Sequence, residues 1–169
     1  MEGKRAPPAE LTSNQKGAIA ETAIAHMAIK LGIDVYRPYI EGGRYDLIFG
    51  FGPKLIRVQC KWAKKVGDVV VLRLQSSRRT RDGIRSRSYT EDEIDAVAAY
   101  CPDLDTCYLL PGAMVTQRRA LHLRLVACKN HQKARLIWAK DYELGAIAQL
   151  GERLRGTQEA AGSSPASST

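Results

Sequence analysis

Three polar side chains on neighbouring apolar segments carry the chemistry that we expect of this sequence. Asp46 opens one segment, and Gln59 and Lys61 lie in the next, with twelve residues between Asp46 and Gln59. Because side chains alternate along a strand, Gln59 and Lys61 share a face, and a hairpin at Gly52-Pro53 can bring Asp46 beside them. Burying a carboxylate, an amide and an ammonium together costs several kcal/mol unless a divalent cation compensates. The spacing therefore predicts a metal site on one face of a sheet.

Each of these residues also has an ordinary alternative role. Asp46 can be a turn residue at the start of a strand, and Gln59 with Lys61 can form the solvent face of an amphipathic strand. Those roles do not explain why a glutamate in a helical segment, Glu21, an aspartate after Gly42-Gly43 and a Gln-x-Lys tripeptide occur together in this order. The combination favours a catalytic site.

The elements that must position these residues follow from the apolar pattern. Apolar residues recur at helical spacing over residues 16–31, with Ser13 or Asn14 as the N-cap and Gly32 as the stop. Short β-branched and aromatic runs then predict four strands, at residues 33–39, 44–51, 55–63 and 69–74. Their connections are short enough for hairpins, so we expect an antiparallel or mixed sheet with the helix packed across it.

The second half of the chain is predicted to complete one α/β domain. Thr90, followed by three acidic residues, predicts a second helix over residues 90–100 that ends at Pro102 and packs beside the first. Residues 106–110 and 121–127 resemble strands, and residues 138–150 have helical spacing. We expect a flexible N-terminus at residues 1–12, a domain over residues 13–150 with a central mixed sheet of four or five strands flanked by helices, and a disordered tail at residues 151–169.

The charge favours a polyanionic partner, with DNA as the first candidate. The 169 residues contain 26 Lys and Arg against 18 Asp and Glu, a net charge of +8. Residues 76–88 are predicted to form a basic loop, with a flexible solvated loop as the alternative reading. The residues expected to contact DNA are Lys64, Lys65, Arg78, Arg79, Arg81, Arg85 and Arg87.

Other features exclude or demote further classes of protein. The first residues have no apolar segment like that of a signal peptide, and no stretch reaches the roughly 18 apolar residues of a membrane span, so we expect a cytoplasmic protein without a membrane. A structural zinc and a Cys60 nucleophile are minor alternatives, because the spacings fit no standard zinc motif and strand alternation turns Cys60 away from Gln59 and Lys61. The residues available for zinc are Cys101, Cys107, His122, Cys128 and His131.

The ordered set Glu21, Asp46 and Gln59-Cys60-Lys61 resembles the PD-(D/E)xK nuclease superfamily. Within it, the chain looks like the small group I intron-associated, homing-type endonucleases, some of which carry glutamine in place of the acidic residue. The resemblance implies a restriction-endonuclease-like core. It also implies that Asp46 and the Cys60 backbone carbonyl bind Mg²⁺, for which Mn²⁺ can substitute. Gln59 would add its amide oxygen, Glu21 would hold metal or water, and Lys61 would assist the attacking water.

The function implied by this resemblance is metal-dependent hydrolysis of DNA by an endonuclease of a mobile element. One metal site cuts one strand, so double-strand cleavage predicts a homodimer or homotetramer. Two alternatives remain open at this point. One is a nuclease that resembles Holliday-junction resolvases, and the other is a catalytically inactive nucleic-acid-binding module in which Gln59 marks the loss of the metal site.

Overall fold

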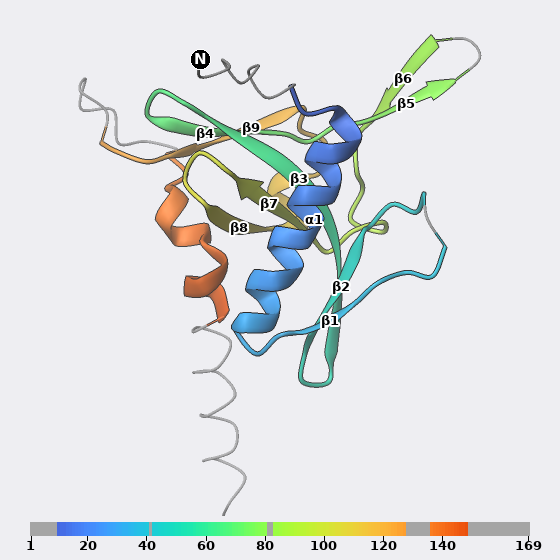
Figure 1. The fold of residues 1–169 in the computed structure, drawn as a ribbon, viewed down its shortest axis with the longest axis horizontal. Coiled ribbons are helices and arrows are strands. Elements are labelled where there is room, and N and C mark those ends of the chain that lie inside the picture. Colours follow the sequence, from blue (N-terminus) through green and yellow to red (C-terminus); the bar gives the residue numbers. More distant parts are fainter. Residues whose placement is uncertain (1–9, 41, 81–82, 128–135, 149–169) are drawn as a thin grey trace, which may run out of the picture.

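The long first helix, α1 (Ser13–Lys30), lies across one face of the central sheet (Figure 1). The computed structural model describes residues 10–40, 42–80, 83–127 and 136–148, with only the backbone described for residues 76–80 and 84–86. Thr12 is the N-cap, one residue before the predicted Ser13, and it exchanges hydrogen bonds with Gln15 in a capping box. Gly32 follows the helix at a φ of 72°, which favours glycine.

Within the described residues, the sheet is mixed and has seven strands, more than the four or five expected. Their order is β1-β2-β3-β4-β9, with β7 and β8 branching from β3. Its centre is β3 (Lys54–Val66), which pairs antiparallel with β2 and β4 and parallel with β7. The other strands are β1 (Asp34–Tyr36), β2 (Leu47–Phe51), β4 (Val69–Arg73), β7 (Ala96–Cys101), β8 (Thr106–Pro111) and β9 (Ala120–Arg124). All four strands predicted before residue 75 are present.

The predicted helix over residues 90–100 is wrong. Only one turn forms, with the Glu93 N–H donating to the Thr90 carbonyl, and the chain then enters strand β7. All of Ala96–Ala99 and Cys101 are buried, because α1 covers one face of β7 and other core residues cover its other face. A strand buried on both faces reads as a continuous apolar run, and alanine-rich runs of that kind resemble helices.

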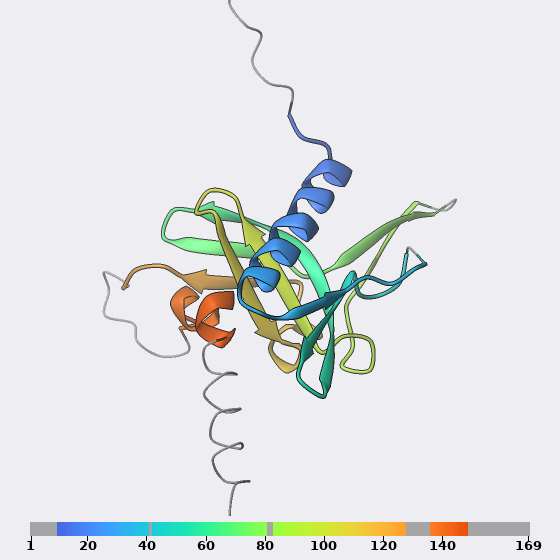
Figure 2. The ribbon, with the colours of Figure 1, turned by 60° about the horizontal axis from the view of Figure 1, so that its bottom comes forward.

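The predicted basic loop is a β-hairpin. Strands β5 (Ser76–Thr80) and β6 (Gly83–Arg87) pair antiparallel as a separate two-stranded sheet that projects away from the domain (Figures 1 and 2). Arg78 pairs with Arg85 in this register, so the arginines lie along the two strands of one arm. The sequence does not predict this hairpin, because its strands lack the apolar alternation that indicates a strand.

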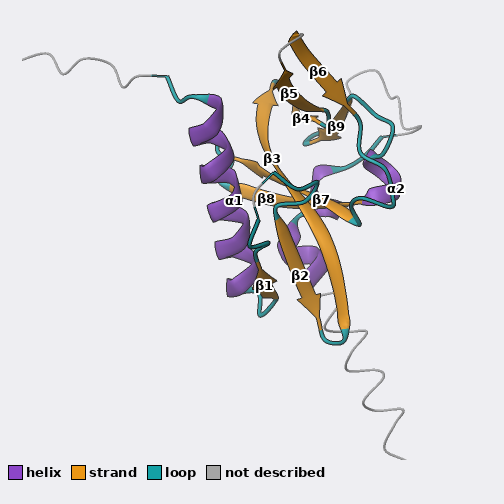
Figure 3. Cartoon of the chain, turned by 90° about the vertical axis from the view of Figure 1, so that its right-hand side faces the viewer, coloured by secondary structure: helices purple, strands orange, loops and turns teal. Residues whose placement is uncertain are grey.

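Two apolar clusters lie on the two sides of the sheet. Ala96 and Ala98 of β7 face the cluster beneath α1, and Val97 and Ala99 face the other. The short helix α2 (Gly112–Val115) lies on the side opposite α1 (Figure 3). No helix in the described part of the chain is long and apolar enough to cross a membrane.

The end of the described chain is partly helical, as the sequence indicated. Strands β8 and β9 occupy the predicted segments, and a 3-10 helix, η1 (Ala139–Tyr142), leads to a helical turn at residues 144–148. The remainder of the predicted helix and the tail over residues 151–169 lie outside the described residues, as do residues 1–9 of the predicted N-terminal segment.

Candidate active site

The hairpin register aligns Asp46 with Gln59, as the spacing predicted. Leu47, the first residue of β2, pairs with Val58 of β3, and the Asp46 N–H donates to the Val58 carbonyl at 3.0 Å. Asp46 is the last residue before β2, and its carboxylate contacts the side chain of Gln59 on β3. The side chains of Gln59 and Lys61 lie on one face of β3, and that of Cys60 lies on the face covered by α1.

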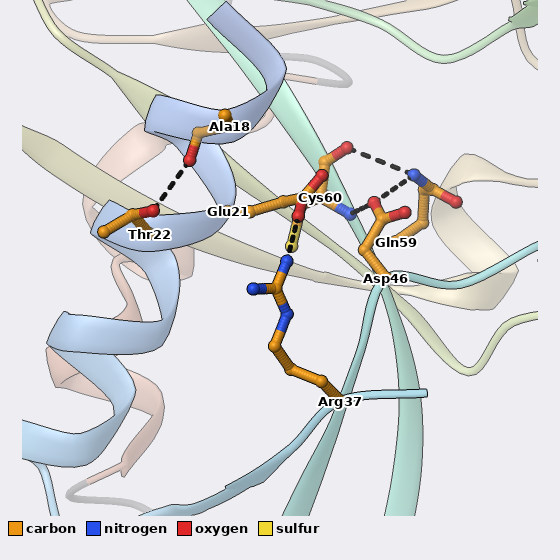
Figure 4. Close-up of polar contacts among 7 residues, drawn as sticks. All are labelled: Ala18, Glu21, Thr22, Arg37, Asp46, Gln59 and Cys60. Atoms are coloured by element: carbon orange, nitrogen blue, oxygen red, sulfur yellow. Dashed lines mark hydrogen bonds and ion pairs between the residues drawn. The ribbon is translucent and has the colours of Figure 1, made fainter. Parts of the chain in front are cut away.

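The Asp46 carboxylate is held by neutral donors (Figure 4). Its Oδ2 accepts a hydrogen bond from the Cys60 N–H at 2.8 Å and another from the Gln59 side-chain Nε2. The same Nε2 also donates to the Cys60 carbonyl at 3.3 Å. One amide group therefore bridges the two oxygens that the family resemblance assigns to a cation.

Burial sets the electrostatics of Asp46. Desolvation raises the pKa of its carboxyl above the ordinary 3.8, and it outweighs the Cys60 N–H, the Lys61 charge, the Gln59 amide and the Arg37 charge, all of which lower it. In the described part of the chain, no cation lies within ion-pair distance of this carboxylate. A carboxylate that is buried and lacks an ion pair is a common mark of a functional site.

Glu21 projects from α1 toward the same cleft. Its Oε2 accepts a hydrogen bond from Arg37 at 2.7 Å (Figure 4). The cleft has a volume of about 890 Å³, and its lining includes Glu21, Arg37 and Asp46 together with Tyr39 and Ile40. The last two are strongly exposed, at 102% and 80%. The predicted accessory glutamate thus faces the cleft of Asp46, with Arg37 beside both carboxylates.

The Lys61 ammonium lies over an aromatic ring. Its Nζ is 5.0 Å from the centre of the Tyr89 ring, and the Arg44 guanidinium carbon is 4.6 Å from the same centre. Tyr89 is only 3% exposed. Lys61 is close enough to Asp46 to lower the pKa of that carboxyl, so the structure brings the predicted lysine to the predicted aspartate.

These groups fit a hard divalent cation with few protein ligands. The described residues contain no group of three or more His, Cys, Asp and Glu side chains that could hold a metal. Mg²⁺ commonly uses only one or two carboxylates and completes its shell with water and substrate phosphate. Asp46, Glu21 and the Cys60 carbonyl satisfy that pattern, and half a turn of the Gln59 amide would exchange its Nε2 for the Oε1 oxygen.

The sequence matches the model of the PD-(D/E)XK endonuclease family over residues 11–145, most of the chain. This chain belongs to the PD-(D/E)XK endonuclease family. Its fold is similar to that of a bacterial homing endonuclease, I-Ssp6803I, with a TM-score of 0.64 and 24% sequence identity. That match covers 92% of this chain and 100% of the other, which confirms the restriction-endonuclease-like fold. A search of curated proteins finds no match.

The basic residues that were predicted to contact DNA lie on strand β3 of this nuclease and on its β5–β6 hairpin, apart from Arg81. Lys64 and Lys65 are exposed on the second half of β3. Arg78, Arg79 and Arg85 lie on the β5–β6 hairpin, whose side chains at these positions are outside the description, as is Arg81 entirely. Arg87 ends β6 and pairs with Glu93 at 2.7 Å.

The structure of the nuclease disfavours two alternatives raised by the sequence, a nucleophilic Cys60 and a structural zinc. The Cys60 side chain is buried in the apolar cluster beneath α1, and burial raises the pKa of its thiol well above the usual range, which disfavours a nucleophilic thiolate. Of the residues considered for zinc, Cys101, Cys107 and His122 form no metal cluster with any other described residue. Cys128 and His131 lie outside the described residues.

Two residues of the nuclease site, Arg37 and Arg44, had no signal in the sequence, whereas Ser88-Tyr89 and Glu93 belong to a phrase that resembles the intron-associated endonucleases. Arg44 and Tyr89 contact each other although they are far apart in the chain, and Arg37 reaches Glu21 from a different element. No short-range pattern links such pairs, because only the tertiary fold brings their elements together. Arg44 also donates to Glu93 at 3.0 Å and to the Ser88 carbonyl at 2.9 Å.

Proposed function

We propose that this PD-(D/E)XK protein is a divalent-metal-dependent endonuclease that hydrolyses DNA phosphodiester bonds, with Asp46, Gln59 and Lys61 at its centre. The observation that carries this proposal is the state of Asp46. It is a buried carboxylate in a cleft, it is aligned with Gln59, and neutral donors rather than an ion pair hold it. A carboxylate of this kind lowers the stability of the metal-free protein, and a bound cation removes that cost.

The side chains divide the work of hydrolysis among them. Asp46, the Cys60 carbonyl and a turned Gln59 amide would hold the cation, Mg²⁺ with Mn²⁺ as a substitute, and Glu21 would hold metal or water. When bound, such a cation would supply Lewis-acid stabilisation of the phosphoryl oxygens and would make water more acidic. Lys61, held over Tyr89, orients the attacking water with its N–H donors.

The substrate is proposed to be duplex DNA that contacts the hairpin arm and the exposed lysines of β3. Arginines and lysines on these surfaces position the phosphate backbone, and the net charge of +8 favours the approach of a polyanion. Replacing Arg78, Arg79 and Arg81 by alanine should weaken DNA binding, and each lost phosphate contact should reduce the salt slope by about one. An unchanged slope would remove the hairpin from the DNA-binding surface.

The role we favour is cleavage by a homing or mobile-element nuclease in the cytoplasm. A homodimer or homotetramer would place two copies of the site on the two strands of a target. Sedimentation of the protein on its cleaved DNA measures this, and a monomer there would contradict it. Competition between a four-way junction and linear duplex separates this role from that of a junction resolvase.

A plasmid-nicking assay tests the chemistry itself. We expect the wild type to nick with Mg²⁺ or Mn²⁺ and to stop with EDTA, and Asp46→Ala and Lys61→Ala to be inactive. Asp95→Ala is a matched control, because it also removes an aspartate beside β3. Equal nicking by the wild type and both site variants would refute the assignment, and absence of both nicking and Mg²⁺ binding in the wild type would favour an inactive binding module.

A further inference from the structure

The segment that follows the hairpin arm leads directly into the active site. Arg87 ends β6 and pairs with Glu93, and the carbonyl of Ser88 accepts from Arg44 at 2.9 Å. Tyr89 lies beneath two cations, and the Thr90 N–H donates to Glu93 at 3.2 Å. Consecutive residues of one short segment thus connect the arm to the catalytic strand.

The Lys61 and Arg44 cations both lie over the buried Tyr89 ring because of cation–π attraction. The face of an aromatic ring is negative, so it attracts Lys61 and Arg44, and the attraction strengthens where water is excluded. Tyr89 is 3% exposed and packs in the apolar cluster, so its ring is a fixed platform. A lysine has four rotatable side-chain bonds, and a rigid ring beneath its ammonium restricts where that charge can lie.

Glu93 balances the second cation and completes the connection. It accepts from Arg44 at 3.0 Å and from Arg87 at 2.7 Å, and its side chain is 16% exposed. Burial raises the pKa of Glu93, but the hydrogen bonds from Arg44 and Thr90 and the charges of Arg44 and Arg87 outweigh this and lower it. The carboxylate is therefore ionised at neutral pH and keeps Arg44 against the ring.

We propose that Tyr89 is a positioning residue for Lys61, and that the Arg44–Glu93–Arg87 ion pairs tie its ring to the foot of the hairpin arm. The segment that joins the DNA-binding arm to the core thereby also places the catalytic ammonium. This inference rests on the proposed function, since it takes Lys61 as the group that orients water and the arm as the group that binds DNA.

The first test separates the ring from its hydroxyl in single-turnover cleavage at saturating DNA. Tyr89→Leu should slow cleavage about three- to thirtyfold, the range of a partly buried cation–π contact, with DNA affinity in Ca²⁺ changed less than about twofold. Tyr89→Phe should restore the wild-type rate. Tyr142→Leu, at a partly buried tyrosine that packs against the same cluster, is the control for lost packing. A wild-type rate for Tyr89→Leu, or an equal loss in Tyr89→Phe, would overturn the proposal.

The second test removes the charge of Glu93 with Glu93→Gln. If Glu93 only opposed DNA, losing a negative charge beside the arm would improve binding and leave cleavage equal or faster. We expect unchanged or tighter binding together with cleavage about two- to fivefold slower, the range of a partly exposed ion pair. Tighter binding with no loss of rate would overturn the link through Glu93.

The third measurement needs no nuclease activity. A ring current should shift the Lys61 Cε protons upfield of those of exposed Lys64 and Lys65 in the NMR spectrum of the wild type and Tyr89→Phe, but not of Tyr89→Leu. Wild-type Lys61 resonances that coincide with those of Lys64 and Lys65 would overturn the positioning role, even in an active enzyme. A shifted Lys61 in a protein that does not cut DNA would support the positioning role and refute the proposed function instead.

Discussion

Two aspartates flank β3 in equivalent places and have opposite electrostatics. Asp46 is the last residue before β2 and faces Gln59, and Asp95 is the last residue before β7 and faces Arg57 two positions earlier on the same strand. Asp95 accepts from the Arg57 Nε at 2.9 Å, from its Nη2 at 3.0 Å and from its backbone N–H at 2.7 Å. Among the described residues, Asp46 accepts only from the Gln59 side-chain amide and the Cys60 backbone N–H.

The pKa values of the two carboxyls diverge for that reason. The hydrogen bonds and charge of Arg57 lower the pKa of Asp95, and burial raises the pKa of Asp46. The Arg57 guanidinium neutralises the Asp95 carboxylate, so no bound cation is required there. The same contact holds the start of β7 against β3. A buried carboxylate without such a guanidinium is costly to the fold and is retained where it binds a ligand. This difference supports the proposal that Asp46 binds the metal and that Asp95 has a structural role.

The largest expected effect is on cleavage. Asp46→Asn should reduce the cleavage rate by about a thousandfold or more, since losing a metal ligand forfeits several kcal/mol of stabilisation of the transition state. Asp95→Asn should stay within a few-fold of the wild type in the same single-turnover assay. A comparable loss in both variants would mean that the two aspartates do not differ in role.

The next effect concerns Gln59, whose amide N–H donates to the buried Asp46 carboxylate and so stabilises it in the metal-free protein. Gln59→Glu removes the N–H donor and adds a second carboxylate, so it should bind Mg²⁺ about tenfold tighter by calorimetry. The same variant should be less stable than the wild type in EDTA, because the two carboxylates repel each other. Gln117→Glu, at an exposed residue, is the control. Unchanged affinity and stability would exclude Gln59 from the site.

The pH dependence of stability should differ in sign between the two aspartates. In the metal-free protein, the pKa of Asp46 is higher in the folded state than the 3.8 of the unfolded chain. Its contribution to stability is therefore complete below pH 3.8 and is lost as the pH rises through the folded pKa. Asp95 has a lowered pKa, so its contribution is complete above pH 3.8 and is lost as pH falls through the folded pKa.

Urea unfolding in EDTA between pH 3 and 7 measures both contributions, with asparagine variants as the references. At neutral pH, Asp46→Asn should be at least as stable as the wild type. Asp95→Asn should lose about 1 kcal/mol or less after allowance for solvent screening of this exposed pair. Identical pH profiles for the two variants would contradict the opposite pKa shifts.

The smallest expected effect concerns the geometry of the Arg57 pair. Arg57→Lys keeps the charge but loses the two-pronged contact with Asp95, so we expect about 0.5 kcal/mol of destabilisation, or about 1–2 °C in Tm, with cleavage unchanged. Thermal unfolding at low salt measures it. A larger effect on cleavage than on Tm would show that this pair also serves the active site.

Much of the catalytic half could be predicted from the sequence because its patterns are local. Helix α1 and strands β1 to β4 follow from apolar spacing, and short hairpins left few ways to pair them. The alignment of Asp46 with Gln59 followed from the same hairpin. The second half is harder to predict. The strand β7 is buried on both faces, so its sequence predicts a helix, and the arm has no apolar alternation, so its sequence predicts a loop.

Residue types and short-range spacing were enough to identify the family, the strand that carries Gln59 and Lys61, and the aspartate that contacts Gln59. Tertiary packing was needed to show that Asp46 is buried with no ion pair among the described residues, while Asp95 has one. The fold also places the Arg44 and Lys61 cations over the Tyr89 ring. Burial and contacts between distant segments depend on how the elements pack. Under the proposed function, that packing leaves Asp46 rather than Asp95 able to bind a metal.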